Sequence, residues 1–306
     1  MNNAWIFPGQ ASQKVGMGKD LFEETELGKQ MFNQANDIME CDITSIIFNG
    51  PDKRLQQTQY TQPAIYIVSV IIGELLKNKG IRPSAVAGHS LGEYSALTIA
   101  DVLDFKTGLL LVKTRSEEMA KAGKNTKGSM AAIIGLDNNL IKEICDQYDG
   151  DGIVVAANFN CPKQVVISGT INAVKSIMNS AKKNGARMTV ELNVSGAFHS
   201  PLMASAREAL AEKLNSIEIS DSQIPVYVNV DAKPVKNSNE IISSLIRQLE
   251  NPVLWLETIT NLKKDGFSSF LEIGPGKVLQ GLNKRIDRLL QTKSIGSIEQ
   301  ISNYNV

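Results

Sequence analysis

One stretch, Val86 to Tyr94 with the sequence VAGHSLGEY, constrains the fold more than any other part of the chain. Small and branched apolar residues lead into Gly88, and a helix-compatible run leaves from Gly92. Ser90 is therefore predicted on a sharp turn between a strand and a helix, where flanking glycines expose its hydroxyl above a sheet edge. The free N–H groups and the dipole at the start of such a helix favour a developing oxyanion. In this context the G-x-S-x-G pattern predicts a serine nucleophile.

Composition and charge argue against several classes of partner. Lys+Arg and Asp+Glu both number 32 in 306 residues, so the formal net charge is zero and nothing global favours nucleic acid or a membrane surface. The cysteines Cys41, Cys145 and Cys161 are widely spaced and lack metal-ligand spacing, which favours a reducing cytoplasmic location. No signal peptide precedes Trp5, and the most apolar stretch, residues 64–76, is too short to span a bilayer.

Strand and helix patterns alternate in both halves of the chain, which predicts a parallel sheet covered on both faces. Pro63 is placed at the first position of a helix, Gly274-Pro275-Gly276 opens a last long helix, and the tail after Ser297 is predicted to be disordered. The expected strands are residues 5–7, 85–88, 224–228 and 270–273. The expected helices before that last one are residues 27–41, 43–48, 63–79, 91–100, 105–122, 201–215, 240–249 and 253–264.

Between about residues 124 and 193 the pattern changes to β-α-β-β-α-β, the ferredoxin-like arrangement. The expected strands here are residues 130–134, 153–157, 164–168 and 188–192, with helices at 138–148 and 171–184. The larger domain is then discontinuous, with residues 1–123 and 197–306 forming one unit and 124–196 an inserted subdomain.

The chain has only two histidines, which narrows the mechanism. A serine nucleophile needs a base within hydrogen-bond reach. On a strand, His89 would point to the opposite face from its neighbour Ser90, so His199 is the candidate base. No Asp or Glu after Ser90 stands out as the acid of a Ser-His-acid triad.

Six motifs occur in the order seen in malonyl-CoA:acyl carrier protein transacylases, which the chain resembles over essentially its whole length. These motifs are Phe7-Pro8-Gly9-Gln10, Gly88-His89-Ser90-Leu91-Gly92-Glu93, Lys113 to Met119, Ala197 to Met203, Arg247-Gln248-Leu249 and Leu271 to Gly276. The resemblance implies an α/β-hydrolase-like parallel-sheet domain with a ferredoxin-like insert, which agrees with the topology expected above.

The resemblance also implies roles for individual residues. Ser90 is the nucleophile and His199 the base, while the backbone N–H groups of Gln10 and Leu91 form the oxyanion hole. In the family the histidine is oriented by the main chain at the position of Gln248, which would explain the missing triad acid.

Substrate choice is expected to depend on a second group of residues. Arg115 presents a planar guanidinium that can hold the free carboxylate by which malonyl differs from acetyl, and Met119 of the same motif is expected to contact the substrate. Phe198 resembles the malonyl-selective form of its motif, in which a bulky aromatic leaves little room for a methyl branch. Ala11 departs from the glycine common at that position in the family.

The implied reaction is a two-step transfer of malonyl from malonyl-CoA, through a Ser90 acyl-enzyme, to the phosphopantetheine thiol of acyl carrier protein. It serves fatty acid synthesis or a polyketide assembly line with a free-standing acyltransferase, and it requires no metal or redox cofactor. Two alternatives stay open: a thioester hydrolase using the same serine, and a non-catalytic docking module for the carrier protein. The carrier protein, which is typically acidic, would dock on the basic cluster Lys284, Arg285 and Arg288 or on Lys182-Lys183.

Overall fold

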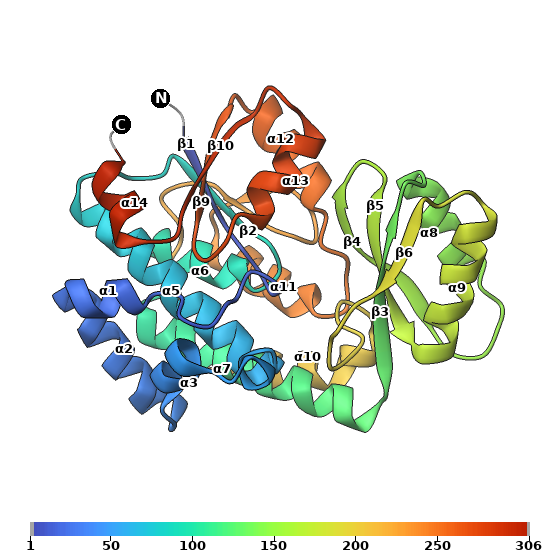
Figure 1. Ribbon diagram of the computed structural model, residues 1–306, viewed down its shortest axis with the longest axis horizontal. Helices are drawn as coiled ribbons and strands as arrows, with labels where there is room; N and C mark the ends of the chain where they lie inside the picture. The colour runs from blue at the N-terminus through green and yellow to red at the C-terminus, as the bar shows by residue number, and fades with distance from the viewer. Residues whose placement is uncertain (1–2, 305–306) are drawn as a thin grey trace.

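The computed structural model describes residues 3–304 and contains two β-sheets with helices packed around them (Figure 1). The larger sheet has the strand order β10-β9-β1-β2-β7-β8. Its strands are parallel except for β8, which pairs antiparallel with β7. These strands are β1 (Asn3–Phe7), β2 (Ala85–Gly88), β7 (Val226–Tyr227), β8 (Pro234–Val235), β9 (Ser269–Ile273) and β10 (Gln291–Ile295).

Helices cover both faces of this sheet, as the alternation along the chain predicted. The helices of the large domain are α1 (Lys19–Glu24), α2 (Glu26–Met39), α3 (Ile43–Asn49), α4 (Asp52–Leu55), α5 (Thr58–Asn78), α6 (Gly92–Ile99), α7 (Phe105–Asn125), the 3₁₀ turn η1 (Pro201–Met203), α10 (Ala204–Asn215), α11 (Ser238–Gln248), α12 (Trp255–Lys264), α13 (Val278–Ile286) and α14 (Ile298–Asn303). None of the helices within residues 3–304 is long and apolar enough to cross a membrane.

Strand β1 shows how the sequence divides its side chains between the two faces. Trp5 and Phe7 lie in the core formed with α5, α6 and α7, whereas Ala4 and Ile6 lie in the core formed with α12 and α13. All four are completely buried, because successive side chains of a strand point to opposite faces. A strand that is apolar on both faces is the pattern expected for the centre of a parallel sheet.

The second sheet is antiparallel, with the strand order β4-β5-β3-β6. Its helices α8 and α9 pack on one face and lie on the outer side of the molecule (Figure 1). Ala131 and Ile133 of β3 point into that core, while Met130 and Ala132 face the larger domain and line a cavity there. The elements are β3 (Gly128–Ile134), α8 (Asn138–Asp146), β4 (Val154–Cys161), β5 (Gln164–Thr170), α9 (Ile171–Lys183) and β6 (Met188–Glu191).

The predicted start of the long apolar helix is wrong. Helix α5 begins at Thr58, so Pro63 lies inside the helix rather than at its first position. Proline lacks the N–H that would bond to the Gln59 carbonyl one turn earlier. The Ser116 hydroxyl of α7 contacts that carbonyl at 3.5 Å, and the dense packing of α5 against α7 holds the helix across the proline.

The C-terminal region also differs from the prediction. The last long helix is the shorter α13, the edge strand β10 follows it, and the tail predicted to be disordered forms α14 through Asn303. Ser297 caps α14, and Asp20 accepts a hydrogen bond from the N–H of Ile298. Lys79 donates to the carbonyl of Ile301. The sequence signal was weak because β10 is mostly polar and α14 depends on contacts with residues far away in the chain.

If α14 is an integral part of the fold, Ile301→Ala will lower the free energy of unfolding by about 2 kcal/mol, because Ile301 is a core side chain only 3% exposed. The neighbouring Ser302→Ala change, at an exposed position, will alter it by less than about 0.5 kcal/mol. Chemical denaturation of the two variants measures both effects. Equal stability of the two would contradict the docking of α14.

Candidate active site

Ser90 lies at the turn between β2 and α6, and its backbone is in the left-handed region with φ of 52°. The turn requires two glycines, because the backbone packs so closely at Gly88 and Gly92 that no side chain fits. A Cβ on Gly88 would lie 1.9 Å from the carbonyl carbon of Gly92, and a Cβ on Gly92 would lie 2.0 Å from the carbonyl oxygen of Phe7. The turn therefore has the strained strand-to-helix geometry of a nucleophile elbow.

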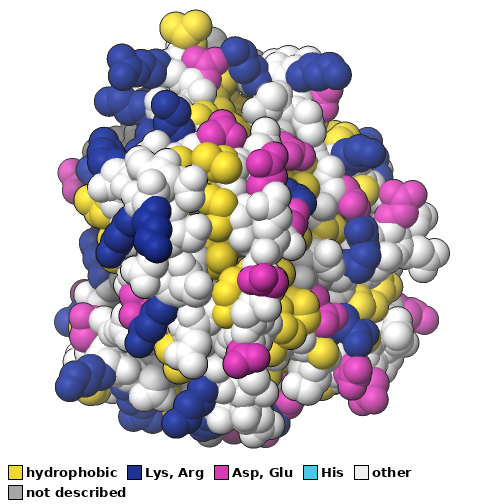
Figure 2. Space-filling view, turned by 90° about the vertical axis from the view of Figure 1, so that its right-hand side faces the viewer, with side chains coloured by type: hydrophobic (Ala, Val, Ile, Leu, Met, Phe, Trp, Pro, Cys, Tyr) yellow, Lys and Arg dark blue, Asp and Glu magenta, His cyan; other side chains and the backbone are white. Residues whose placement is uncertain are grey.

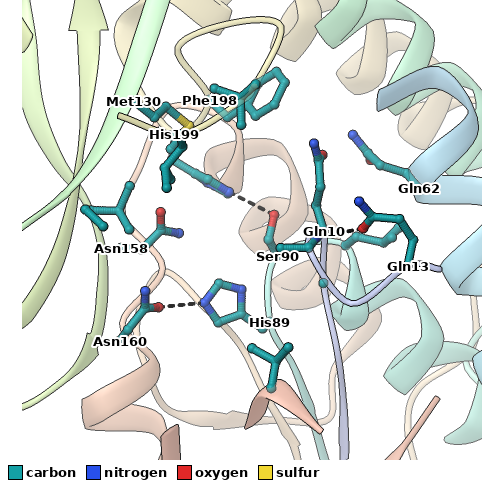
Figure 3. Close-up of a pocket in the computed structure, with 18 of the residues that line it drawn as sticks. Gln10, Gln13, Gln62, His89, Ser90, Met130, Asn158, Asn160, Phe198 and His199 are labelled. Carbon is teal, nitrogen blue, oxygen red and sulfur yellow. Dashed lines mark hydrogen bonds between the residues drawn. The ribbon is translucent and has the colours of Figure 1, made fainter. Parts of the chain in front are cut away.

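The structure brings His199 to this serine across 109 residues of sequence. The Ser90 Oγ and His199 Nε2 atoms are 2.8 Å apart (Figure 3), and His199 Nδ1 lies 2.8 Å from the Gln248 main-chain oxygen. A carbonyl only accepts hydrogen bonds, so Nδ1 carries the proton and Nε2 is free to accept the serine proton. Gln248 thus contacts the imidazole through its main chain, at the position that the family resemblance implied.

Burial and charge keep this imidazole neutral. Desolvation is the larger cause and the Arg115 guanidinium the next, and together they lower the pKa of His199 to about 3. His199 is 4% exposed. The unprotonated state that a general base needs is therefore present at neutral pH.

Arg115 of α7 lies beside the same serine with only 1% of its surface exposed. Its Nη2 donates to Ser90 Oγ (3.0 Å) and to Gln248 Oε1 (2.8 Å), and its Nη1 donates to Gln62 Oε1 (2.5 Å). Within residues 3–304 it forms no salt bridge. A buried guanidinium held by neutral amides is a candidate anion site, because desolvation makes an unpaired charge costly.

Two further side chains hold the elbow from behind. Asn229 Oδ1 accepts from the Ser90 N–H at 2.7 Å, and its Nδ2 donates to the Gly88 carbonyl at 2.6 Å. The carboxylate of Glu93 accepts from the Asn229 N–H (3.0 Å) and from Gln248 Nε2 (2.9 Å). Glu93 is fully buried, and desolvation raises its pKa to about 7.

The two predicted oxyanion donors border the cavity in front of Ser90. In the part of the chain that the structure describes, neither the Gln10 nor the Leu91 backbone N–H has a hydrogen-bond partner. Ala11 adopts φ of 85°, a conformation that favours glycine. The loop thus has the left-handed conformation although this residue carries a methyl group, and that costs some backbone strain.

A cavity of about 540 Å³ opens between the larger domain and the antiparallel sheet. The predicted contact residues Met119 and Phe198 lie in its wall, 2% and 6% exposed. Figure 3 shows Phe198 and Met130 above the serine and His89 below it, bonded to Asn160 at 2.8 Å rather than to Ser90. Among residues 3–304 no group of three or more His, Cys, Asp or Glu is arranged to hold a metal ion.

The two basic surfaces considered for docking differ in their distance from this cavity. Helix α13 contributes Leu282 to the cavity wall, and its Arg285 hydrogen-bonds Gln164, another wall residue. Lys182 and Lys183 end α9, which packs on the opposite face of the antiparallel sheet. On that side of the molecule basic and acidic side chains are interspersed (Figure 2). The cluster at α13 is therefore the one next to the cavity wall.

Sequence reasoning missed Gln62 and Asn229, and it assigned no role to Glu93 although the motif contains it. Each is buried and polar. Gln62 precedes a long apolar run, so an amide there was a usable signal. Asn229 follows a two-residue strand, and nothing local distinguishes it from a turn asparagine.

The sequence and the fold of this chain are similar to those of known acyl transferases. A family model described as acyl transferase domain matches residues 4–300. The malonyl CoA-acyl carrier protein transacylase of Bacillus subtilis is 43% identical over 299 residues, which cover 97% of this chain and 94% of that protein. The crystal structure of the Synechocystis sp. malonyl-CoA:ACP transacylase gives a TM-score of 0.92 at 43% identity, covering 99% of this chain and 100% of that one. A malonyl-transacylase in complex with a type II PKS acyl-carrier protein gives 0.95 at 40% identity, with coverages of 99% and 98%.

The depressed pKa of His199 predicts a loss of stability in acid. Above the unfolded-state pKa of 6.5 both states are neutral, whereas below it only the unfolded chain binds a proton until about pH 3. Lowering the pH to 5 will therefore remove about 2 kcal/mol of unfolding free energy through this residue. Denaturation of the wild type and of His199→Gln at pH 7.5 and 5 measures it. An identical pH dependence in the two proteins would contradict a neutral His199.

Proposed function

Since the chain belongs to the acyl transferase family and is 43% identical to a malonyl CoA-acyl carrier protein transacylase, we propose that Ser90 carries malonyl from coenzyme A to acyl carrier protein. The activity is S-malonyl transfer in fatty acid or polyketide synthesis, with malonyl-CoA and phosphopantetheinylated acyl carrier protein as substrates. One observation carries the assignment of the site: Ser90 Oγ lies 2.8 Å from His199 Nε2 and 3.0 Å from the buried Arg115 guanidinium.

In the first half-reaction, His199 Nε2 takes the Ser90 hydroxyl proton as the oxygen attacks the thioester carbonyl. The carbonyl oxygen becomes an oxyanion that accepts from the free N–H groups of Gln10 and Leu91. As the tetrahedral intermediate collapses, the carbon–sulfur bond breaks and the imidazolium returns the proton to the coenzyme A sulfur. A malonyl ester remains on Ser90.

The second half-reaction reverses these steps. The phosphopantetheine thiol gives its proton to His199 and attacks the ester, and Ser90 Oγ leaves with that proton. A hydrolase would use water at this point; the transacylase relatives give this alternative no support. The chemistry needs only the serine, the histidine and the backbone donors, so we propose that it uses no metal or redox cofactor.

Arg115 supplies the selection for a carboxylated acyl group. Its guanidinium is presented beside the nucleophile by the neutral oxygens of Gln62 and Gln248, which a carboxylate outcompetes as a partner for a buried charge. Pairing with the malonyl carboxylate neutralises the charge of Arg115, which is the second cause of the low pKa of His199. Binding of malonyl therefore raises the pKa of His199 and makes it a stronger base. Phe198 in the cavity wall limits a methyl branch on the same acyl group.

The finer description of the fold is part of this proposal. The parallel sheet with its serine elbow supports an α/β-hydrolase-like domain of residues 1–123 and 197–306. The strand order β4-β5-β3-β6 and the β-α-β-β-α-β sequence support a ferredoxin-like insert of residues 124–196. Three free cysteines support a cytoplasmic location, because unpaired thiols are typical of reducing compartments.

Intact mass spectrometry tests the proposed transfer. Brief exposure to malonyl-CoA will add one malonyl group at Ser90, and later addition of phosphopantetheinylated carrier protein will move that group to the carrier. Ser90→Ala is the control for labelling of other side chains. Decay of the adduct to free malonate at a rate unaffected by carrier protein would make the chain a hydrolase, and absence of any adduct would exclude both reactions.

Arg115→Ala will lower the second-order rate constant for acylation by malonyl-CoA about 100-fold, the equivalent of about 3 kcal/mol for two charged hydrogen bonds. Acylation by acetyl-CoA will be retained or increased, because loss of the positive charge raises the pKa of His199. Arg207→Ala serves as the matched control, because it removes from α10 a guanidinium that is paired with Glu250. An equal loss for both substrates in folded Arg115→Ala protein would refute the role of Arg115.

A further inference from the structure

A line of three hydrogen bonds leads away from Arg115 through the interior of the protein. Arg115 Nη1 donates to Gln62 Oε1 (2.5 Å), Gln62 Nε2 donates to Thr58 Oγ1 (2.8 Å), and Thr58 Oγ1 donates to Gln10 Oε1 (3.1 Å). Gln62 and Thr58 are each 1% exposed. The line joins the guanidinium that selects the acyl group to the side chain of an oxyanion-loop residue.

The chemistry of the groups fixes the direction of these bonds. Arg115 only donates, so the oxygen of the Gln62 amide must face it and the NH₂ group must face away. That NH₂ group contacts Thr58 Oγ1 and, more weakly, Met119 Sδ at 3.5 Å. The single proton of the Thr58 hydroxyl points to Gln10 Oε1, which leaves its lone pairs for Gln62. Rotating the amide by 180° would set donor against donor at Arg115.

Helix α5 supplies both middle members of the line. Thr58 is its first residue and Gln62 lies four residues later, so the two side chains share one face of the helix. The sequence places this hydroxyl and this amide just before the buried apolar run of residues 63–68. Buried polar groups of this kind are costly unless fully bonded, and fully bonded they set a unique geometry.

We propose that Thr58 is a positioning residue for acyl-group selectivity: it holds the Gln62 amide in the orientation that fixes the Arg115 guanidinium in front of Ser90. This inference rests on the proposed malonyl transfer, because selectivity for a carboxylate is what it explains. Thr58 touches neither the substrate nor the reacting atoms. Preorganisation of Arg115 lowers the cost of bringing its donors to the carboxylate.

The test compares acylation of Ser90 by malonyl-CoA and by acetyl-CoA in Thr58→Val, which keeps the shape of the side chain and removes the hydroxyl. The rate constant for malonyl-CoA will fall about tenfold, and that for acetyl-CoA will change less than about twofold. Acetyl transfer is spared because the proposed oxyanion donor of Gln10 is its main-chain N–H. The side chain of Gln10 is half-buried, so water can take the place of the Thr58 hydroxyl there. Thr58→Ser, which restores the hydroxyl, will return the malonyl rate to that of the wild type.

Thr61→Val is the matched control on the same helix. The Thr61 hydroxyl is equally buried but bonds only to main-chain carbonyls, those of Leu55 (2.5 Å) and Gln57 (3.1 Å). This variant will lose stability without changing the ratio of the two rate constants. Thr58→Ala is measured in parallel, so that the result does not depend on accommodation of the valine methyl group.

The outcomes separate this inference from the function on which it rests. A wild type without preference for malonyl-CoA over acetyl-CoA would overturn the proposed function and the role of Thr58 with it. A wild-type preference that Thr58→Val and Thr58→Ala retain, whether their rates are normal or equally reduced for both substrates, would overturn the role of Thr58 alone. A preference that falls in both variants and returns in Thr58→Ser would support it.

Discussion

The site is built around one buried positive charge. Arg115 lies in the interior with its two terminal nitrogens bonded to amide oxygens and to the proposed nucleophile, and no carboxylate contacts it in residues 3–304. Burial of a guanidinium is costly, so neighbours must turn acceptor atoms toward it. The Gln62 and Gln248 amides do so. The same charge also contributes, after the larger effect of burial, to the lowered pKa that keeps His199 neutral.

The elbow is held in a strained conformation by polar contacts on its inner side. Ser90 and His199 both have positive φ, at 52° and 57°, which costs free energy for residues with a side chain. Asn229 satisfies the Ser90 N–H, and Gln248 Nε2 donates to the Ser90 carbonyl at 3.1 Å. Glu93 joins these two side chains from below. With the N–H and the carbonyl of Ser90 both bonded, relaxing this residue would break hydrogen bonds, so the strain persists.

The sequence predicted the parts of this structure that depend on local pattern. The elbow, the alternation of strands and helices, and the β-α-β-β-α-β insert each leave a periodic or motif signal, and the scarcity of histidines identified His199. Other features depend on distant contacts. Asn229 reaches the backbone of the Ser90 turn only because β7 lies beside β2. Helix α14 forms because Asp20 and Lys79 bond to its two ends. The predicted helix start at Pro63 was wrong because the packing of α5 against α7 overrides the local preference of proline for a first helical turn.

A main-chain carbonyl, and not a triad carboxylate, bonds to His199 Nδ1, and this neutral partner is compatible with the same buried charge. A carboxylate bonded to Nδ1 would stand beside Gln248, whose amide oxygen accepts from Arg115. A negative charge near the guanidinium would compete for the charge that, in the proposed reaction, the malonyl carboxylate binds. A main-chain carbonyl selects the same histidine tautomer without a net charge. The buried carboxyl group of Glu93 accepts from the Gln248 side chain rather than from His199. In the proposed reaction the base is therefore oriented by a neutral oxygen, and the substrate brings the negative charge.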